Sequence, residues 1–229
     1  MNSSFVASIS HATNLAATHL ANGQRDQAAS LLQKVLFALK NRVPEEDKPS
    51  PRESGRSIIA HAVDCVPGFG PQSTRAVADS TFEFSDRFFL LPSSCDDQSP
   101  EDLSLLSFLV LYNMGTIRHQ IGLCTGRSSE LIKAIRMYAF AVSTVETLPL
   151  GAISTVRVLC SLYNNMGHAY EQLGAFQYSQ ACMERLLNIL HATQQSPHCD
   201  QMLTADDCDF YYQYFGMGPG KTFCAAPTA

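Results

Sequence analysis

The chain has 229 residues, of which 45% are hydrophobic, so it is long enough to bury a sizeable core. Its formal charge of −5 argues against binding to nucleic acid, which needs a basic patch or stripe. No run of about 18 apolar residues occurs, so we expect neither a membrane-spanning helix nor a membrane partner. Residues 1–11 have no signal-peptide pattern, and we expect a cytoplasmic protein.

Residues 1–40 predict a first helical hairpin. Apolar residues recur every three or four positions from Ser10 to Lys40, which is the period of an amphipathic helix. Gly23 interrupts this period, and glycine at a helix end can adopt the left-handed conformation that closes a turn. We therefore expect two helices joined by a tight turn.

Residues 41–98 predict a long insert of low regularity. Residues 43–57 hold three prolines and many charges, as a linker does. A weak helix or turn is expected at 57–66, and a loop at 67–71. Residues 81–85 alternate between polar and apolar, and 88–91 are apolar, so the insert can carry one short β-hairpin. The alternative is that these apolar side chains tether the insert to the helices without forming strands.

Residues 99–195 predict two further hairpins. Ser99 and Pro100, followed by two acidic residues, are typical of a helix start. The expected helices run from there to 123, over 129–147, over 152–173 and over 176–194. In the tail, 196–229, the aromatic run 210–215 is predicted to cap the last hairpin, and the end of the chain is expected to be disordered.

A ten-residue stretch occurs twice, at 113–122 and at 165–174, with five identical positions. A fainter copy at 14–23 keeps the first Asn and the closing Gly. Internal repeats of this kind indicate stacked helical hairpins. The copies begin 99 and 52 residues apart, so the stack is predicted to be irregular.

These repeats resemble those of the tetratricopeptide-repeat (TPR) proteins, whose helix–turn–helix units carry small and bulky apolar residues at fixed places. The resemblance covers about half of the chain and implies an all-α fold, a short solenoid of three hairpins. Two departures are a turn in the middle copy that is too long and Arg118 in the place of an aromatic residue. The residues assigned to packing between the helices are Leu15, Gly23, Ala28, Leu32, Met114, Gly115, Ala134, Tyr138, Ala141, Met166, Gly167, Tyr170, Gly174 and Met183.

The resemblance also implies a concave groove that holds an extended or helical peptide of another protein. Its predicted lining is Thr13, Ala17, Leu20, Tyr112, Thr116, His119, Gln120, Asn164, His168, Glu171 and Gln172. The same polar residues would also suit an ordinary solvated helix face.

One asparagine recurs in every copy, as Asn14, Asn113 and Asn165. TPR modules that hold chaperone tails combine such an Asn with Lys and Arg to bind a carboxylate. The predicted groove lining contains no Lys or Arg, so the charge-assisted hydrogen bonds of that clamp would be missing. The three asparagines are therefore predicted either to bind a peptide backbone or to help pack the hairpins.

Motifs for chemistry fail on spacing. Residues 216–222 resemble a phosphate loop but have one residue too few between their glycines. The eight cysteines include no C-x-x-C pair, and His191, His198, Cys199 and Cys208 match no zinc spacing, so we expect reduced thiols and no metal. His168 and Glu171 are an ordinary helical pair.

We therefore expect a non-catalytic protein–protein interaction scaffold without a cofactor. The alternative is a self-associating or autoinhibited regulatory domain whose tail or insert occupies the groove. An enzyme on a helical scaffold would need a pocket of convergent titratable groups, for which the sequence gives no signature. Neither the partner nor the oligomeric state is indicated.

Overall fold

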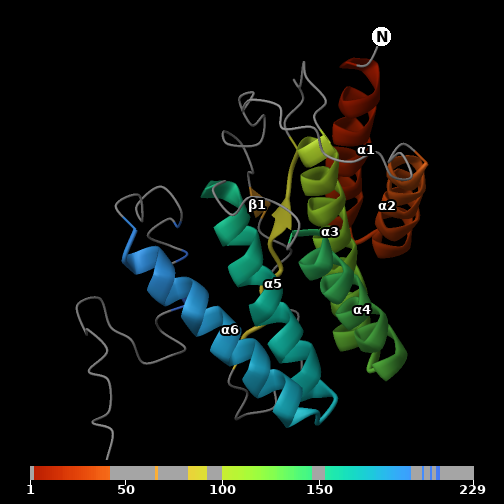
Figure 1. The fold of residues 1–229 in the computed structure, drawn as a ribbon. Coiled ribbons are helices and arrows are strands. Elements are labelled where there is room, and N and C mark those ends of the chain that lie inside the picture. Colours follow the sequence, from red (N-terminus) through yellow and green to blue (C-terminus); the bar gives the residue numbers. More distant parts are fainter. Residues whose placement is uncertain are drawn as a thin grey trace, which may run out of the picture.

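The computed structural model describes residues 3–41, 65–66, 82–91, 100–145, 153–196, 203, 207 and 210–211. Within these ranges the protein is all-α, as predicted, and its helices pack pairwise in sequence order (Figure 1). Each pair is antiparallel, and each packs on the next pair along the chain. The helices are α1 (Ser3–Ala21), α2 (Arg25–Lys40), α3 (Pro100–Thr125), α4 (Ser128–Val145), α5 (Ile153–Gln172) and α6 (Phe176–Gln194).

Glycines with positive φ close the first and last hairpins, as the sequence predicted. Gly23 has φ 73° and Gly174 has φ 70°. The N–H of Gly23 donates to the carbonyl of Leu20, so the glycine satisfies a carbonyl at the end of α1. The turns of the first and the last hairpin are therefore short.

The turn of the middle hairpin corrects the repeat alignment. Gly122, aligned with the turn glycines, lies inside α3, and the residue with positive φ is Gly126, at 66°. The prediction of an over-long turn was wrong, because the extra residues lengthen the helix instead. Gly122 is needed for packing, since a Cβ there would come within 2.7 Å of the Leu131 side chain in α4.

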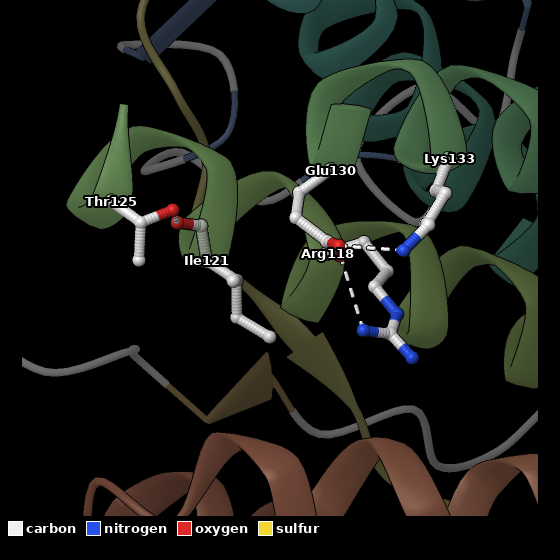
Figure 2. A network of polar contacts seen from close by, with 5 residues as sticks. All are labelled: Arg118, Ile121, Thr125, Glu130 and Lys133. Atoms are coloured by element: carbon white, nitrogen blue, oxygen red, sulfur yellow. Dashed lines mark hydrogen bonds and ion pairs between the residues drawn. The ribbon is translucent and has the colours of Figure 1, made fainter. Parts of the chain in front are cut away.

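The same hairpin is fastened by charges beside its turn (Figure 2). Glu130 of α4 accepts from Arg118 of α3 at 3.1 Å and from Lys133 at 2.6 Å. The hydrogen bond from Lys133 and the charges of both cations lower the pKa of Glu130. The Thr125 hydroxyl donates to the Ile121 carbonyl and finishes the last turn of α3. Arg118, the departure from the repeat pattern, therefore binds a carboxylate across the hairpin.

The insert contributes two short strands with an unexpected pairing. β1 (Cys65–Val66) and β2 (Phe88–Phe89) pair antiparallel. A helix or turn was predicted through 57–66 and is wrong at residues 65–66. A strand was predicted at 81–85, but residues 82–87 have no regular secondary structure. The predictions for 43–57 and 67–71 lie outside the described residues.

Residues 82–91, here called the inserted segment, belong to the interior of the protein. In Figure 1 this yellow stretch passes between α3 and α5. Phe88, Phe89 and Leu91 are buried in the core cluster of α1–α4, which includes part of α5. Phe82 is buried in a second cluster with α5, α6, Leu203 and Tyr211. The inserted segment therefore joins the two cores.

None of the helices in the described ranges is both long and apolar enough to cross a bilayer. The Cys160 and Cys182 side chains are buried, and the Cys124 side chain is exposed.

Candidate functional site

Three asparagines hold the inserted segment by its backbone. Asn165 of α5 accepts from the N–H of Ser85 and donates to its carbonyl, both at 2.8 Å. Asn113 of α3 does the same with Phe89, at 2.9 and 2.8 Å. Asn14 of α1 binds Leu91 in the same way, at 3.1 and 3.0 Å. Each amide thus exchanges two hydrogen bonds with one residue, as a neighbouring β-strand would. We call these three residues the asparagine clamps.

Two further contacts follow the same register. The amide of Asn164 donates to the carbonyl of Glu83 at 2.6 Å. The hydroxyl of Tyr112 donates to the carbonyl of Arg87 at 3.2 Å. Side chains of α1, α3 and α5 therefore bind the backbone of every second residue of the segment: Glu83, Ser85, Arg87, Phe89 and Leu91. In an extended chain alternate residues present their N–H and C=O groups to the same edge, so this register indicates an extended backbone.

Burial explains why side-chain amides take this role. Phe89 is fully buried, and its backbone groups need partners because an unpaired buried N–H or C=O is costly. β1 pairs with β2 along one edge, and Asn113 supplies the partners along the other. The asparagine side chains therefore provide the hydrogen-bond partners that a second neighbouring strand would provide.

The Phe82 side chain lies against α5 where that helix has no side chain. Gly167 faces the Phe82 ring, and a Cβ at this position would overlap the ring. Phe82 is 3% exposed and belongs to the same core cluster as Cys160, Cys182 and Leu186. Gly167 therefore forms a niche that a flat side chain can enter.

We expect Gly167→Ala to loosen the first part of the inserted segment. The added methyl group would overlap the Phe82 ring, so either the ring must leave its niche or α5 must shift. Overpacking of this kind costs about 1–3 kcal/mol, which urea unfolding measures. Release of the segment is followed separately, as native-state trypsin cleavage after Arg87 identified by mass spectrometry.

Gly115→Ala is the matched control for this substitution. A methyl group at Gly115 would meet the Tyr138 ring of α4 instead of the inserted segment. We expect a comparable loss of stability without faster cleavage after Arg87. Equal cleavage rates in Gly167→Ala and Gly115→Ala would contradict the role given to the niche.

A pair of buried histidines lies beneath Phe84. Nε2 of His119 and Nδ1 of His168 are 3.0 Å apart, and Nδ1 of His119 is 3.4 Å from the Tyr138 hydroxyl. The Phe84 ring centroid is 4.5 Å from that of His119 and 6.1 Å from that of His168. Burial lowers the pKa of His168 to about 4, and burial followed by repulsion from His168 lowers that of His119. Both imidazoles are therefore neutral at pH 7.

We expect the stability of the protein to fall as the pH decreases from 6.5 to about 4. Both histidines have a lower pKa in the folded state, so the unfolded chain takes up protons first and is favoured by acid. For His168 alone, the difference between 6.5 and about 4 corresponds to about 3 kcal/mol. Urea unfolding at pH 7, 5.5 and 4.5 measures it.

His168→Gln is the control for this pH dependence. Gln keeps hydrogen-bonding groups but does not titrate, so the loss of stability between pH 7 and 4.5 should be smaller. The hydrogen bond from Lys133 lowers the pKa of Glu130, so this carboxylate protonates at a lower pH than an ordinary glutamate. An unchanged slope in His168→Gln would exclude the histidine pair as the main cause.

Three residues beyond α6, Asp207, Phe210 and Tyr211, contact the inserted segment or α5. The carboxylate of Asp207 is fully buried and forms ion pairs with Arg87 and with Arg157 of α5, the latter at 2.8 Å. The guanidinium of Arg87 also lies over the Phe210 ring, 5.5 Å from its centroid. The Tyr211 hydroxyl is 3.0 Å from that of Ser161 in α5. Asp207, Phe210 and Tyr211 therefore contact both the segment and α5.

Four of the residues predicted to line a groove contact the inserted segment: Tyr112, His119, Asn164 and His168. The Gln172 amide is 3.4 Å from Nε2 of His168, and Glu171 acts on the same imidazole through its charge. Gln120 instead accepts from Arg25 of α2, between two hairpins. The other predicted lining residues, Thr13, Ala17, Leu20 and Thr116, are buried in the helical packing.

The residues assigned to repeat packing differ in how far they are buried. Ala28, Leu32, Ala134, Tyr138 and Ala141 are fully buried, and Met114 is 6% exposed. Met166, Tyr170 and Met183 are half-buried and pack at the edge of the cores, whereas Leu15 is 39% exposed. Gly115 faces Tyr138, Gly167 faces Phe82, and the remaining two glycines close turns.

The asparagine clamps were not among the residues predicted to line the groove. The sequence feature that could have identified them is the recurrence of one Asn in all three repeats. The ion pairs of Asp207 with Arg87 and Arg157 could not be predicted from the sequence, because no motif links residues so far apart. Among the described residues no group of three or more potential metal ligands occurs. His198, Cys199, Cys208 and 216–222 lie outside the described residues.

No family model matches the chain, and searches among curated proteins and among solved structures also find no match. The functional interpretation therefore depends on the contacts of this chain's own residues.

Proposed function

We propose that the protein is a non-catalytic interaction module of TPR-like, solenoidal architecture that binds an extended peptide of a partner protein. In the closed form its own inserted segment occupies the peptide site. Partner binding then requires the segment to leave, so the module is autoinhibited. This combines the two functions that the sequence suggested.

The observation that supports the proposal most strongly is the set of asparagine clamps. Each clamp sits at the same place in its repeat and takes both backbone groups of one bound residue. Hydrogen bonds to the backbone alone are the usual way to hold an extended chain, as in β-strand addition. A site built from such bonds can accept a second peptide of the same backbone geometry.

A fluorescent peptide copying residues 81–92 tests the proposal by anisotropy. The receptor is the full chain with Phe82→Ala and Phe84→Ala, which weakens the resident segment and leaves every clamp in place. We expect the peptide to bind this opened variant at least about tenfold more tightly than wild type, since the resident segment no longer competes well. Adding Asn165→Ala to the opened variant should remove most of that binding.

N-methylated peptides separate clamp binding from other binding. N-methylation at the residue equivalent to Ser85 removes the N–H that Asn165 accepts, without changing a side chain. Methylation at the residue equivalent to Leu90, whose N–H is not among the clamped groups, is the matched control. Equal affinities for both peptides, or no binding of any peptide, would refute the proposal. A two-chain mass in light scattering would assign the segment to a second copy.

A further inference from the structure

We infer that the peptide site selects an extended ligand with an aromatic residue, any residue, an aromatic residue and a small residue in succession. This is the pattern of Phe82, Glu83, Phe84 and Ser85 in the resident segment. The inference rests on the proposed function and adds the chemical class of the partner's peptide.

The selectivity must come from side-chain positions, because the clamps are indifferent to sequence. Asn14, Asn113 and Asn165 bind only N–H and C=O groups, which every residue except proline has. Discrimination between peptides therefore falls to the places where ligand side chains are enclosed.

The first enclosed position is the niche at Gly167. The ring in it is 3% exposed and lies where a Cβ of α5 would otherwise be, so the space suits a flat group. The ring belongs to the second core cluster, whose members include Cys182, Leu186 and Leu190, so its surroundings are apolar. A polar or charged ligand side chain would be buried here without its hydration.

The second enclosed position is the face of the histidine pair. The tilted ring of Phe84 covers both imidazoles, with centroids 4.5 and 6.1 Å away, and an aromatic ring there gains from contact with the imidazole faces. Between the two aromatic positions, the side chain of Glu83 is exposed. Burial therefore does not limit the size or polarity of the ligand residue that separates the aromatics.

The third position admits only a small side chain. Ser85 is 3% exposed while its backbone is held by Asn165. Its hydroxyl has no hydrogen-bond partner among the described residues. Small size rather than the hydroxyl is therefore required, and alanine should serve as well as serine.

A substitution series in the labelled 81–92 peptide, measured on the opened variant, tests the inference. Alanine at either aromatic position should weaken binding by at least about tenfold, because the first ring is buried and the second covers the two imidazoles. Leucine at the Ser85 position should have a similar effect. Alanine at the Glu83 or Ser85 position should change the affinity by less than about threefold. If the opened variant does not fold, Phe84→Ala alone replaces it, since Phe84 is only half-buried.

The possible outcomes distinguish a failure of the inferred ligand class from a failure of the proposed function. Sensitivity at both aromatic positions and to leucine, with tolerance at Glu83, supports the ligand class. Binding that depends on the clamps but tolerates alanine at both aromatic positions overturns the ligand class and leaves the proposed function intact. Absence of binding by every peptide overturns both.

Discussion

Asn113→Ala is expected to lower the free energy of unfolding by about 3 kcal/mol, one of the two largest effects at the site. The substitution removes two hydrogen bonds and leaves the N–H and C=O of Phe89 without partners on that edge. Both residues are fully buried, so water cannot take the place of the lost amide. Each unsatisfied backbone group then costs about 1–3 kcal/mol. Urea unfolding measures the loss.

Two comparisons make the Asn113 prediction specific. Asn14 makes the same pair of hydrogen bonds but is half-buried, so Asn14→Ala should cost less, about 1 kcal/mol. Asn188 is exposed on α6, and Asn188→Ala should stay within about 0.5 kcal/mol of wild type. Trypsin cleavage after Arg87 should accelerate in Asn113→Ala and not in Asn188→Ala. Equal effects of the three substitutions would argue against backbone clamping.

The helices could be predicted because their signals are local. Apolar periodicity and the glycines at 23 and 174 place the ends of the first and last hairpins, since a turn needs positive φ within a few residues of the helix end. The helix predicted to about residue 123 ends at Thr125, so only the repeat alignment was wrong there: Gly122 copies the sequence of a turn glycine but lies inside α3, against Leu131. Sequence alone does not distinguish these two uses of glycine.

The inserted segment could be predicted only in part. Its apolar residues indicated docking on the helices, but the strand at 88–89 has its partner at 65–66, and pairing partners are not encoded locally. The clamps act between residues 24 to 80 positions apart. Their recurrence in three repeats indicated a shared role. The two predicted roles were binding a peptide backbone and packing the hairpins, and the clamps bind the backbone of a segment that is itself packed between the helices.

The second large effect is expected from Asp207→Ala, at about 3 kcal/mol. The fully buried carboxylate of Asp207 lies between Arg87 and Arg157, so its removal leaves two like charges facing each other without their anion. The loss should lie at the low end for a buried pair, because both guanidiniums keep some contact with water. Urea unfolding gives the energy, and cleavage after Arg87 reports whether the segment is released.

Glu130→Ala is the matched control for Asp207→Ala, because Glu130 also lies between two cations, Arg118 and Lys133. The Glu130 side chain is 10% exposed, but its partner Lys133 is 51% exposed and is readily solvated once the carboxylate is removed, so the loss should cost about 1 kcal/mol. Glu130 belongs to the α3–α4 hairpin, and its hydrogen bonds and ion pairs among the described residues are with Arg118 and Lys133, not with Arg87 or Asp207. We therefore expect faster cleavage after Arg87 only in Asp207→Ala. If that variant loses stability while the bond after Arg87 stays protected, Asp207 stabilises α5 without holding the inserted segment in its site.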